Sequence, residues 1–351
     1  MYLNQALPGQ GHVIRNLSVR AVSLIVMLCL SALGHAVTVS DLYTVSVPVE
    51  NQSADSRQQG TQLALQQVVV KVSGLSASAT SESVQQAVSR ADRYVKSFRF
   101  NRDDDALYLK VVFAPNLIDQ LLTDAHLPVW GKSRPLVVLW NGVEEGQERQ
   151  WISADTPQWY KTMARAMDER GIPVLWPAQD LEDEATLPLE RLWGLFRGDI
   201  EKASERYRAD AILAGRMTPT LNGDWRYSGF FEHDGEVLDL SSRGETAEEA
   251  LRQVTEQIAV LLSSRYAVID DGTSSGHELR VSGVSSFRAY HDLLAYLQAN
   301  VAVNNVRVRA VHENDLVLDL DLSADWNQVW ATLSLDNRLL LSEQGDYVWQ
   351  Q

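Results

Sequence analysis

The stretch Asp210-Ala211-Ile212-Leu213-Ala214-Gly215-Arg216-Met217 has the length and apolar character of a buried strand, and two turn-forming pairs follow it. Asn-Gly and Asp-Gly pairs favour tight hairpin turns, so further strands are predicted on both sides of each pair. After the last of these strands, Thr246 and Glu249 form a capping box ahead of apolar residues at helical spacing, which predicts a long helix. The predicted turn pairs are Asn141-Gly142, Asn222-Gly223 and Asp234-Gly235.

Outward from this segment, the chain divides into three small modules that mix helices and strands. We expect an N-terminal module at residues 37–127, a middle module at 128–269 and a βαββα module at 277–351. A polar stretch at residues 270–276 has the composition of a linker between the last two. In the first module the predicted order is β-α-α-β-β-α, with a helix over residues 84–98. The predicted fold class is therefore α+β.

Residues 1–36 have the pattern of a cleaved export signal. Arg15 and Arg20 precede the apolar stretch 21–33, and Gly34-His35-Ala36 places small residues before a cleavage point near Ala36. Thirteen apolar-rich residues are too few to span a bilayer, which needs about 20, and no other stretch comes closer. We therefore expect an exported, soluble product without a transmembrane anchor after processing.

Charge and cysteine content limit the function further. Without residues 1–36 the chain keeps 315 residues, of which 29 are basic and 46 acidic, a net charge of −17. Such an acidic protein is poorly suited to bind nucleic acid or anionic lipid, so we predict no nucleic-acid partner. The sole cysteine, Cys29, lies within the signal, which leaves no thiol or disulfide in the product.

Two short motifs match the letters of catalytic or nucleotide-binding loops but lack the required context. Gly272-Thr273-Ser274-Ser275-Gly276 matches a hydrolase nucleophile elbow, yet it follows a predicted helix and precedes a strand. Gly131-Lys132-Ser133 resembles the end of a phosphate-binding loop, yet Pro135 and a strand follow where that loop needs a helix. Both segments are therefore interpreted as structural.

Metal-binding and acid–base patterns are weak as well. The histidines after residue 36 are isolated, and none has a partner at helical metal-ligand spacing, so surface or strand-edge positions are expected for them. Asp103-Asp104-Asp105 and Glu182-Asp183-Glu184 are interpreted as solvated turns, with a loose calcium site as the alternative. We therefore predict no catalytic residue, no cofactor and no metal, and a protein that is not an enzyme.

Tryptophan is the least ordinary component of the sequence. All ten tryptophans follow residue 36, and Trp140 stands in an apolar strand where a core role is expected. The functional alternative is an aromatic platform for a sugar ring or a partner peptide. Trp151, near a loop, and Trp349, near the carboxyl end, are the candidate interaction surface. Seven tryptophans fall in the middle module: Trp130, Trp140, Trp151, Trp159, Trp176, Trp193 and Trp225.

Several stretches are similar to a known family. They are Leu127-Pro128-Val129-Trp130-Gly131-Lys132-Ser133-Arg134-Pro135-Leu136-Val137-Val138-Leu139-Trp140, Leu192-Trp193-Gly194, the residues 207–216 and Asp41-Leu42-Tyr43. On them the chain resembles an uncharacterised family of exported Gram-negative proteins, the domain of unknown function two thousand and sixty-six. The resemblance implies a periplasmic protein and supplies no catalytic residue.

The middle module also looks like the anticodon-binding-like fold of several envelope proteins. The likeness rests on residues 209–216, a strand with Trp225, the hairpin at Asp234-Gly235 and a closing helix. The amino-terminal domain of the Tol-system translocation protein, the outer-membrane activators of peptidoglycan synthases and the curli secretion channel share that fold. In these proteins it serves as a docking surface, which is an analogy of fold.

Three hypotheses about function follow. The first is a non-catalytic periplasmic protein that docks onto an envelope protein or complex. A second hypothesis is a protein that binds a glycan or peptidoglycan fragment with the tryptophan-rich middle module. The third is a hydrolase whose site the sequence does not reveal.

Overall fold

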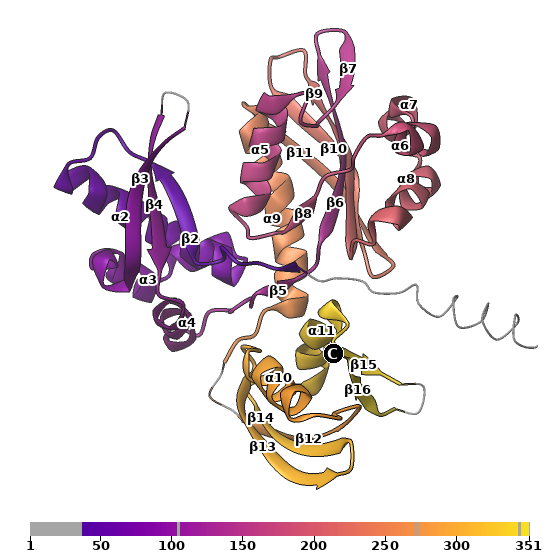
Figure 1. Ribbon diagram of the computed structural model, residues 1–351. Helices are drawn as coiled ribbons and strands as arrows, with labels where there is room; N and C mark the ends of the chain where they lie inside the picture. Colours follow the sequence, from indigo (N-terminus) through magenta and orange to yellow (C-terminus); the bar gives the residue numbers. More distant parts are fainter. Residues whose placement is uncertain (1–36, 104–105, 271, 273, 343–344, 351) are drawn as a thin grey trace, which may run out of the picture. The chain divides into compact units, whose positions relative to one another are not determined.

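The computed structural model describes residues 37–103, 106–270, 272, 274–342 and 345–350 (Figure 1). The predicted export signal, residues 1–36, lies outside the described residues. The described residues form one compact unit. Within the described part of the chain, no helix combines the length and apolarity needed to cross a membrane. Helices and mixed sheets alternate along the chain, so the predicted α+β class is confirmed.

The N-terminal region builds a three-stranded antiparallel sheet, in the order β2-β4-β3, beneath its helices. Ser53 caps helix α2 through its hydroxyl, and Gly74 ends that helix in the left-handed conformation at φ 74°. The buried core lies between the sheet and α2, α3 and α4. The elements are β2 (Thr44–Pro48), α2 (Ala54–Ser73), α3 (Glu82–Val88), β3 (Val95–Asp103), β4 (Ala106–Phe113) and α4 (Pro115–Asp124).

One prediction for this region is wrong. The helix expected over residues 84–98 ends at Val88, and a short 3₁₀ turn at Ala91–Tyr94 leads into β3. Val95 and Phe98 instead pair with Phe113 and Val111 of β4. Antiparallel pairing with the next strand of the chain therefore outweighs the helical spacing of the apolar residues.

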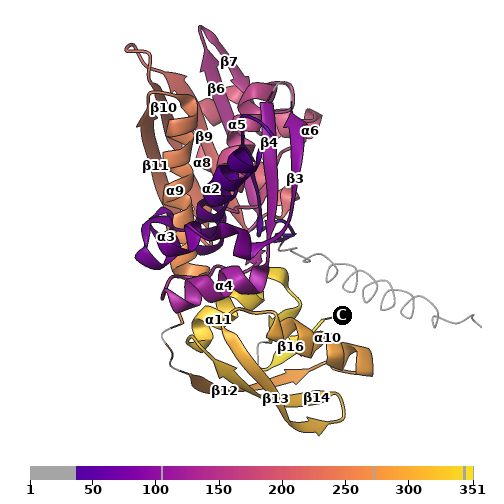
Figure 2. The ribbon, with the colours of Figure 1, turned by 90° about the vertical axis from the view of Figure 1, so that its left-hand side faces the viewer.

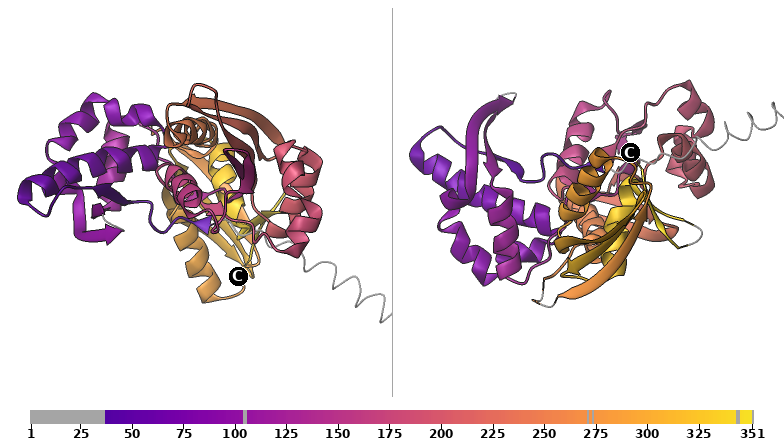
Figure 3. Two further views of the ribbon diagram at one scale, coloured as in Figure 1. Left: turned by 90° about the horizontal axis from the view of Figure 1, so that it is seen from above. Right: turned by 60° about the horizontal axis from the view of Figure 1, so that its bottom comes forward.

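The middle region has a mixed sheet in the order β11-β10-β9-β6-β7, with β8 also paired to β6. Helices α5 and α9 cover one face, and α7 and α8 cover the other (Figures 1 and 3). The elements are β6 (Val137–Glu145), β7 (Glu148–Trp151), α5 (Pro157–Asp168), β8 (Val174–Leu175), α6 (Leu181–Thr186), α7 (Leu189–Trp193), α8 (Arg197–Ser204), β9 (Ala211–Pro219), β10 (Trp225–His233), β11 (Glu236–Gly244) and α9 (Ala247–Tyr266).

Two of the three predicted hairpin turns are confirmed. Asp234 and Gly235 have φ values of 53° and 75°, which a tight two-residue turn requires. Asn222-Gly223 lies in the turn between β9 and β10. Asn141-Gly142 is wrong as a turn, because both residues lie inside β6. The Asn141 side chain is instead buried, donating to the Leu213 carbonyl and accepting from the Tyr227 hydroxyl.

The C-terminal region forms a sheet in the order β13-β14-β12-β16-β15, with α10 and α11 on one face (Figure 2). The predicted βαββα unit is present, and the unpredicted strands β15 and β16 follow it. Ser275 and Gly276, predicted as linker, already pair with β14. The elements are β12 (Ser275–Ser282), α10 (Phe287–Gln298), β13 (Val303–His312), β14 (Asp315–Leu322), α11 (Trp326–Leu333), β15 (Leu339–Leu341) and β16 (Tyr347–Trp349).

The cores of the three regions share residues at their borders. Val301, which follows α10, packs against the N-terminal core as well as its own, and Leu335 belongs to the middle core. Ser76 and Arg170 both contact the carboxylate of Glu256 on α9, at 2.6 Å each. The independence of the modules at 37–127, 128–269 and 277–351 stays a prediction.

Arg134 connects the N-terminal and middle regions through hydrogen bonds to both. It lies in the short strand β5 (Ser133–Arg134), which pairs with β1 (Val37–Thr38), and it is fully buried. Its guanidinium donates to five carbonyl oxygens at 2.7 to 3.0 Å and to no carboxylate in the described part of the chain. The acceptors are Lys71, Trp130, Gly131, Arg170 and Gly171.

The position of these carbonyls explains why a buried cation is tolerated. Lys71 is in the last turn of α2, and Arg170 and Gly171 directly follow α5, so the carbonyl ends of two helices point at one guanidinium. Helix carboxyl ends carry partial negative charge and unpaired carbonyls. Burial lowers the pKa of the Arg134 guanidinium, and the carbonyl hydrogen bonds offset that cost.

Candidate functional site

An aromatic cleft opens at the exposed edge of the middle sheet, with a volume of about 600 Å³. Trp151 is the last residue of β7, Tyr160 lies on α5, and Trp176 directly follows β8. The Tyr160 and Trp176 rings are 4.2 Å apart between centroids and tilted by 33°. All three rings are partly exposed. We call the space that these three rings line the aromatic cleft.

Trp151 is held by the sheet behind it. Its ring packs against Trp140 at a centroid distance of 5.8 Å in an edge-on arrangement. Trp140 is fully buried, and its indole N–H donates to the Ser204 hydroxyl at 2.9 Å. The Thr156 hydroxyl closes the loop after β7, because it lies 3.0 Å from the Trp151 carbonyl and accepts from the Ser153 N–H. A rigid core residue therefore fixes one wall of the aromatic cleft.

The opposite wall is the loop that carries Trp176, and a polar cluster anchors it. The Tyr207 hydroxyl accepts from the Ala178 N–H at 2.8 Å and donates to the buried carboxylate of Asp183. Arg206 donates to both Asp180 and Asp183. The hydrogen bond from Arg206 lowers the pKa of the Asp180 carboxyl to about 2, and burial raises that of Tyr207 to about 12.

Strand β7 presents an unpaired side to the aromatic cleft. It is at the end of the strand order, and no described strand pairs with its outer side. The Ile152 N–H donates inward to Asn141 at 2.8 Å, and inward bonding alternates along an antiparallel ladder. The backbone N–H groups of Arg149 and Trp151 therefore point outward. A short edge of free backbone donors lies beside partly exposed aromatic rings.

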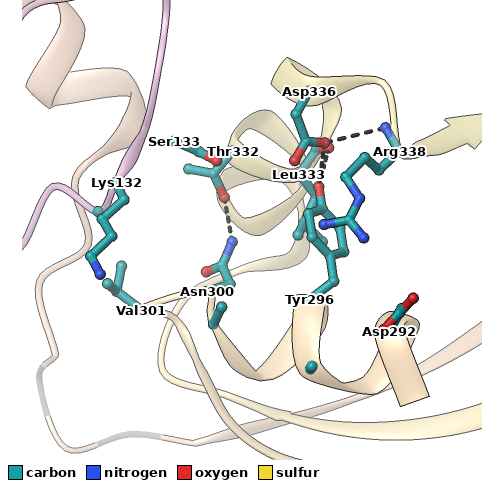
Figure 4. Close-up of a pocket in the computed structure, with 13 residues that line it drawn as sticks. Lys132, Ser133, Asp292, Tyr296, Asn300, Val301, Thr332, Leu333, Asp336 and Arg338 are labelled. Carbon is teal, nitrogen blue, oxygen red and sulfur yellow. Dashed lines mark hydrogen bonds between the residues drawn. The ribbon is translucent and has the colours of Figure 1, made fainter. Parts of the chain in front are cut away.

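A second cavity, of about 350 Å³, lies beside α10 and α11 (Figure 4). Its walls combine Lys132 and Ser133 of the connecting segment with Asn300, Thr332 and Arg338 of the C-terminal region. Asn300 donates through Nδ2 to the Thr332 hydroxyl at 2.5 Å. We call this space the Arg338 cavity.

Arg338 and Tyr296 form the most polar wall of the Arg338 cavity. The Arg338 guanidinium lies 4.9 Å from the Tyr296 ring centroid and 4.8 Å from that of Trp349. The Tyr296 hydroxyl is 2.7 Å from Asp336 Oδ1, which also accepts from the Arg338 backbone N–H at 3.2 Å. Burial, and then the hydrogen bond to Asp336, raise the pKa of Tyr296, so the phenol stays protonated.

The structure separates the two tryptophans of the candidate interaction surface. Trp151 lines the aromatic cleft and is partly exposed. Trp349 is only 4% exposed, so the expectation that it lies at the surface is wrong. The reason is that β16 inserts between β12 and β15, which places Trp349 under Arg338 and against Tyr296. Trp140 is fully buried, as predicted.

Sequence reasoning missed Tyr160 as a partner of Trp176. The two residues belong to different elements, and only the pairing of β8 with β6 brings them together. The apolar spacing of α5 points to its buried face, which carries Trp159 and Met163. Tyr160 lies on the other face of α5, and no signal in the sequence shows that this face lies beside Trp176.

The buried His233 lies in a hydrogen-bonded arrangement that resembles part of a catalytic site. His233, expected at the surface or a strand edge, is 7% exposed and bonds through Nδ1 to the Asp210 carbonyl at 2.8 Å. A carbonyl only accepts, so Nδ1 carries a proton, and Nε2 lies 2.6 Å from the Tyr266 hydroxyl. Burial raises the pKa of Tyr266 to about 12. Both ring nitrogens of His233 have partners within the protein, so we interpret the arrangement as structural.

The solvated turn predicted at Glu182-Asp183-Glu184 is wrong, because these residues lie in the helix α6. Asp183 is 2% exposed, and its oxygens bind Tyr207, Arg206 and the Gln179 N–H. Asp104 and Asp105 lie outside the described residues. No group of three histidine, cysteine or acidic side chains within the described ranges is arranged to hold a metal ion.

The comparisons with known proteins cover part of the chain. A family model matches residues 36–131, and its description is a domain of unknown function, DUF8605. The resemblance to the domain of unknown function two thousand and sixty-six is therefore wrong. The anticodon-binding-like interpretation of the middle region is wrong too: the match ends before that region, and no comparison shows such a fold.

Other comparisons give little. No curated protein matches the chain. A crystal structure of an uncharacterized protein is 11% identical, over 37% of this chain and 88% of that one. Its TM-score of 0.16 is too low to support any argument about fold.

Proposed function

We propose that this protein is exported to the cell envelope and acts without catalysis, by docking a partner protein in the aromatic cleft. The observation that carries the proposal is the position of the free edge of β7, directly beside Trp151, Tyr160 and Trp176. An extended peptide can add a strand to such an edge, gaining main-chain hydrogen bonds there. Its alternate side chains would then contact the three rings, and aromatic residues dominate binding energy at interfaces.

The walls of the aromatic cleft are suited to binding because they are already formed. Trp140 supports Trp151 from the core, and the cluster of Asp183, Arg206 and Tyr207 anchors the loop of Trp176. A preformed site loses little conformational freedom on binding, which raises affinity. The short edge of β7 supplies few hydrogen bonds to a partner. The aromatic contacts must therefore supply most of the binding free energy.

Site-specific photocrosslinking in intact envelopes tests the proposal. A photoreactive amino acid replaces Ala154, an exposed residue of the aromatic cleft, and a matched variant carries it at Leu221, which is fully exposed and outside the aromatic cleft. We expect a discrete protein adduct from position 154 and none from position 221. Adducts of the same pattern from both positions, or none from either, would contradict docking at this site.

A glycan is the second candidate occupant of the aromatic cleft. The observation in its favour is the Tyr160–Trp176 ring pair, whose faces could stack on a sugar ring, with Asp155, Gln179 and Glu184 as hydrogen-bonding groups at the rim. A panel of envelope glycans and peptidoglycan fragments, followed by tryptophan fluorescence, tests it. Binding that Trp176→Ala removes would support this candidate, and no response to any glycan would exclude it.

A further inference from the structure

The Arg338 cavity carries an inference that is independent of the aromatic cleft. We propose that it binds a carboxylate, with Arg338 as the anchoring cation. The ligand is a monoanion that has a small apolar body, either a small organic acid or the C-terminus of a peptide. The Arg338 cavity has a volume of about 350 Å³, which is within the range of small-molecule sites.

The first step of the argument is the orientation of Arg338. Its guanidinium lies against both the Tyr296 and the Trp349 ring, at 4.9 and 4.8 Å from centroids that are themselves 5.3 Å apart. These two cation–π contacts position the guanidinium, and a carboxylate matches the N–H edge of an arginine with two parallel hydrogen bonds. Arg338 forms no ion pair with any described residue, so this capacity is not used within the chain.

The second step is the rest of the wall. Lys132 adds a second positive charge beside the cavity, although its ammonium lies 5.9 Å from the Tyr43 ring centroid. Ala299, Val301 and Leu333 provide apolar surface for the body of a ligand. In Figure 4, Arg338 and Tyr296 lie side by side on one wall, while Lys132 and Val301 lie on another. The Arg338 cavity therefore combines cationic groups with apolar surface.

The third step decides the charge of the ligand. Asp336 and Asp292 also line the Arg338 cavity. Asp336 accepts from Tyr296 and from the Arg338 backbone, and Asp292 lies 3.8 Å from Arg288. These carboxylates would repel a phosphate dianion more strongly than a monoanion, because Coulomb energy scales with charge. A carboxylate therefore fits better than a phosphate.

The test is a ¹⁹F NMR titration of the purified protein labelled with 5-fluorotryptophan, in which Trp349→Phe assigns the Trp349 signal. The probes are N-acetyl-alanyl-alanine, the C-terminal amide of the same peptide, and butyrate, which is a monoanion at neutral pH. We expect the free acids to shift the Trp349 signal saturably and the amide to bind at least about tenfold more weakly, since it lacks the charge. Butyrate binding as tightly as the peptide acid identifies an organic-acid site, and binding of the peptide acid alone identifies a C-terminus site.

Matched variants isolate the role of Arg338. Arg338→Gln should weaken binding of the free acid by about tenfold or more, and Arg307→Gln, an exposed arginine on β13, should leave it unchanged. Arg338→Lys keeps the charge but loses the forked donor, so it must bind more weakly than the wild type even if Arg338→Gln does not fold. Three results overturn the proposal: wild-type affinity in Arg338→Lys, equal binding of acid and amide, or no saturable shift with any probe up to about 10 mM.

Discussion

The guanidinium of Arg134 lies over the ring of Trp130, with 3.9 Å between Cζ and the ring centroid. Both side chains are fully buried, and the Trp130 carbonyl accepts one of the five hydrogen bonds of the same guanidinium. The pair ties the end of the family-matched residues 36–131 to the carboxyl ends of α2 and α5. The stability of residues 35–351 should therefore depend strongly on Arg134.

Arg134→Met should lower the free energy of unfolding by at least about 3 kcal/mol, because methionine leaves several buried carbonyls without a donor. Urea unfolding measures this effect. Arg288→Met is the control, since the Arg288 side chain is 92% exposed and its loss should change stability by less than about 0.5 kcal/mol. Equal stability of the two variants would show that Arg134 has no special role.

Gly171→Ala should be more destabilising than Gly146→Ala. The two glycines have nearly the same φ, 64° and 67°, so the backbone cost of alanine should be similar at about 1 kcal/mol. A methyl group at Gly171 would collide with the Arg134 guanidinium, whereas nothing lies within 4 Å of one at Gly146. Thermal or urea unfolding measures the loss of stability in each variant, and the difference between the two losses is the cost of the collision with Arg134. Similar losses at the two positions would mean that Arg134 can move aside.

The stability contributed by His277 should fall in acid. His277 stacks on Trp326 with 4.1 Å between ring centroids, and burial lowers the pKa of His277 below its ordinary 6.5. The folded protein therefore favours the neutral ring, so the unfolded chain binds more protons as the pH falls below about 6.5. The stability difference between the wild type and His277→Gln should shrink from pH 7.5 to pH 5. A constant difference for His277→Gln would show that folding does not affect the protonation of His277.

Local sequence signals predicted the parts of the fold that local interactions determine. The turn at Asp234-Gly235 has the positive φ values that the residue pair favours, and Thr246 caps α9 by accepting from the Glu249 N–H. The Glu249 carboxylate returns to the N–H of Glu245, one residue before the predicted position. Such features depend on neighbouring residues, so a single sequence contains them.

Two of the failures involve contacts between residues that are distant in the sequence. Asn141-Gly142 favours a turn locally, but hydrogen bonds to Leu213 and Tyr227 hold it in a strand. Trp349 is near the carboxyl end, yet insertion of β16 into the sheet buries it. The candidate site was predicted in part, because Trp151 was identified and its neighbours in the aromatic cleft were not.

The most direct test of the proposed docking compares Arg149→Pro with Arg149→Ala in capture of envelope proteins. Both variants lose the Arg149 side chain, including its ion pair with Glu144, but only proline removes the outward backbone N–H of β7. If a partner adds a strand to β7, Arg149→Ala should retain a partner that Arg149→Pro loses, while both variants stay folded. Equal capture by the two folded variants would contradict the proposal.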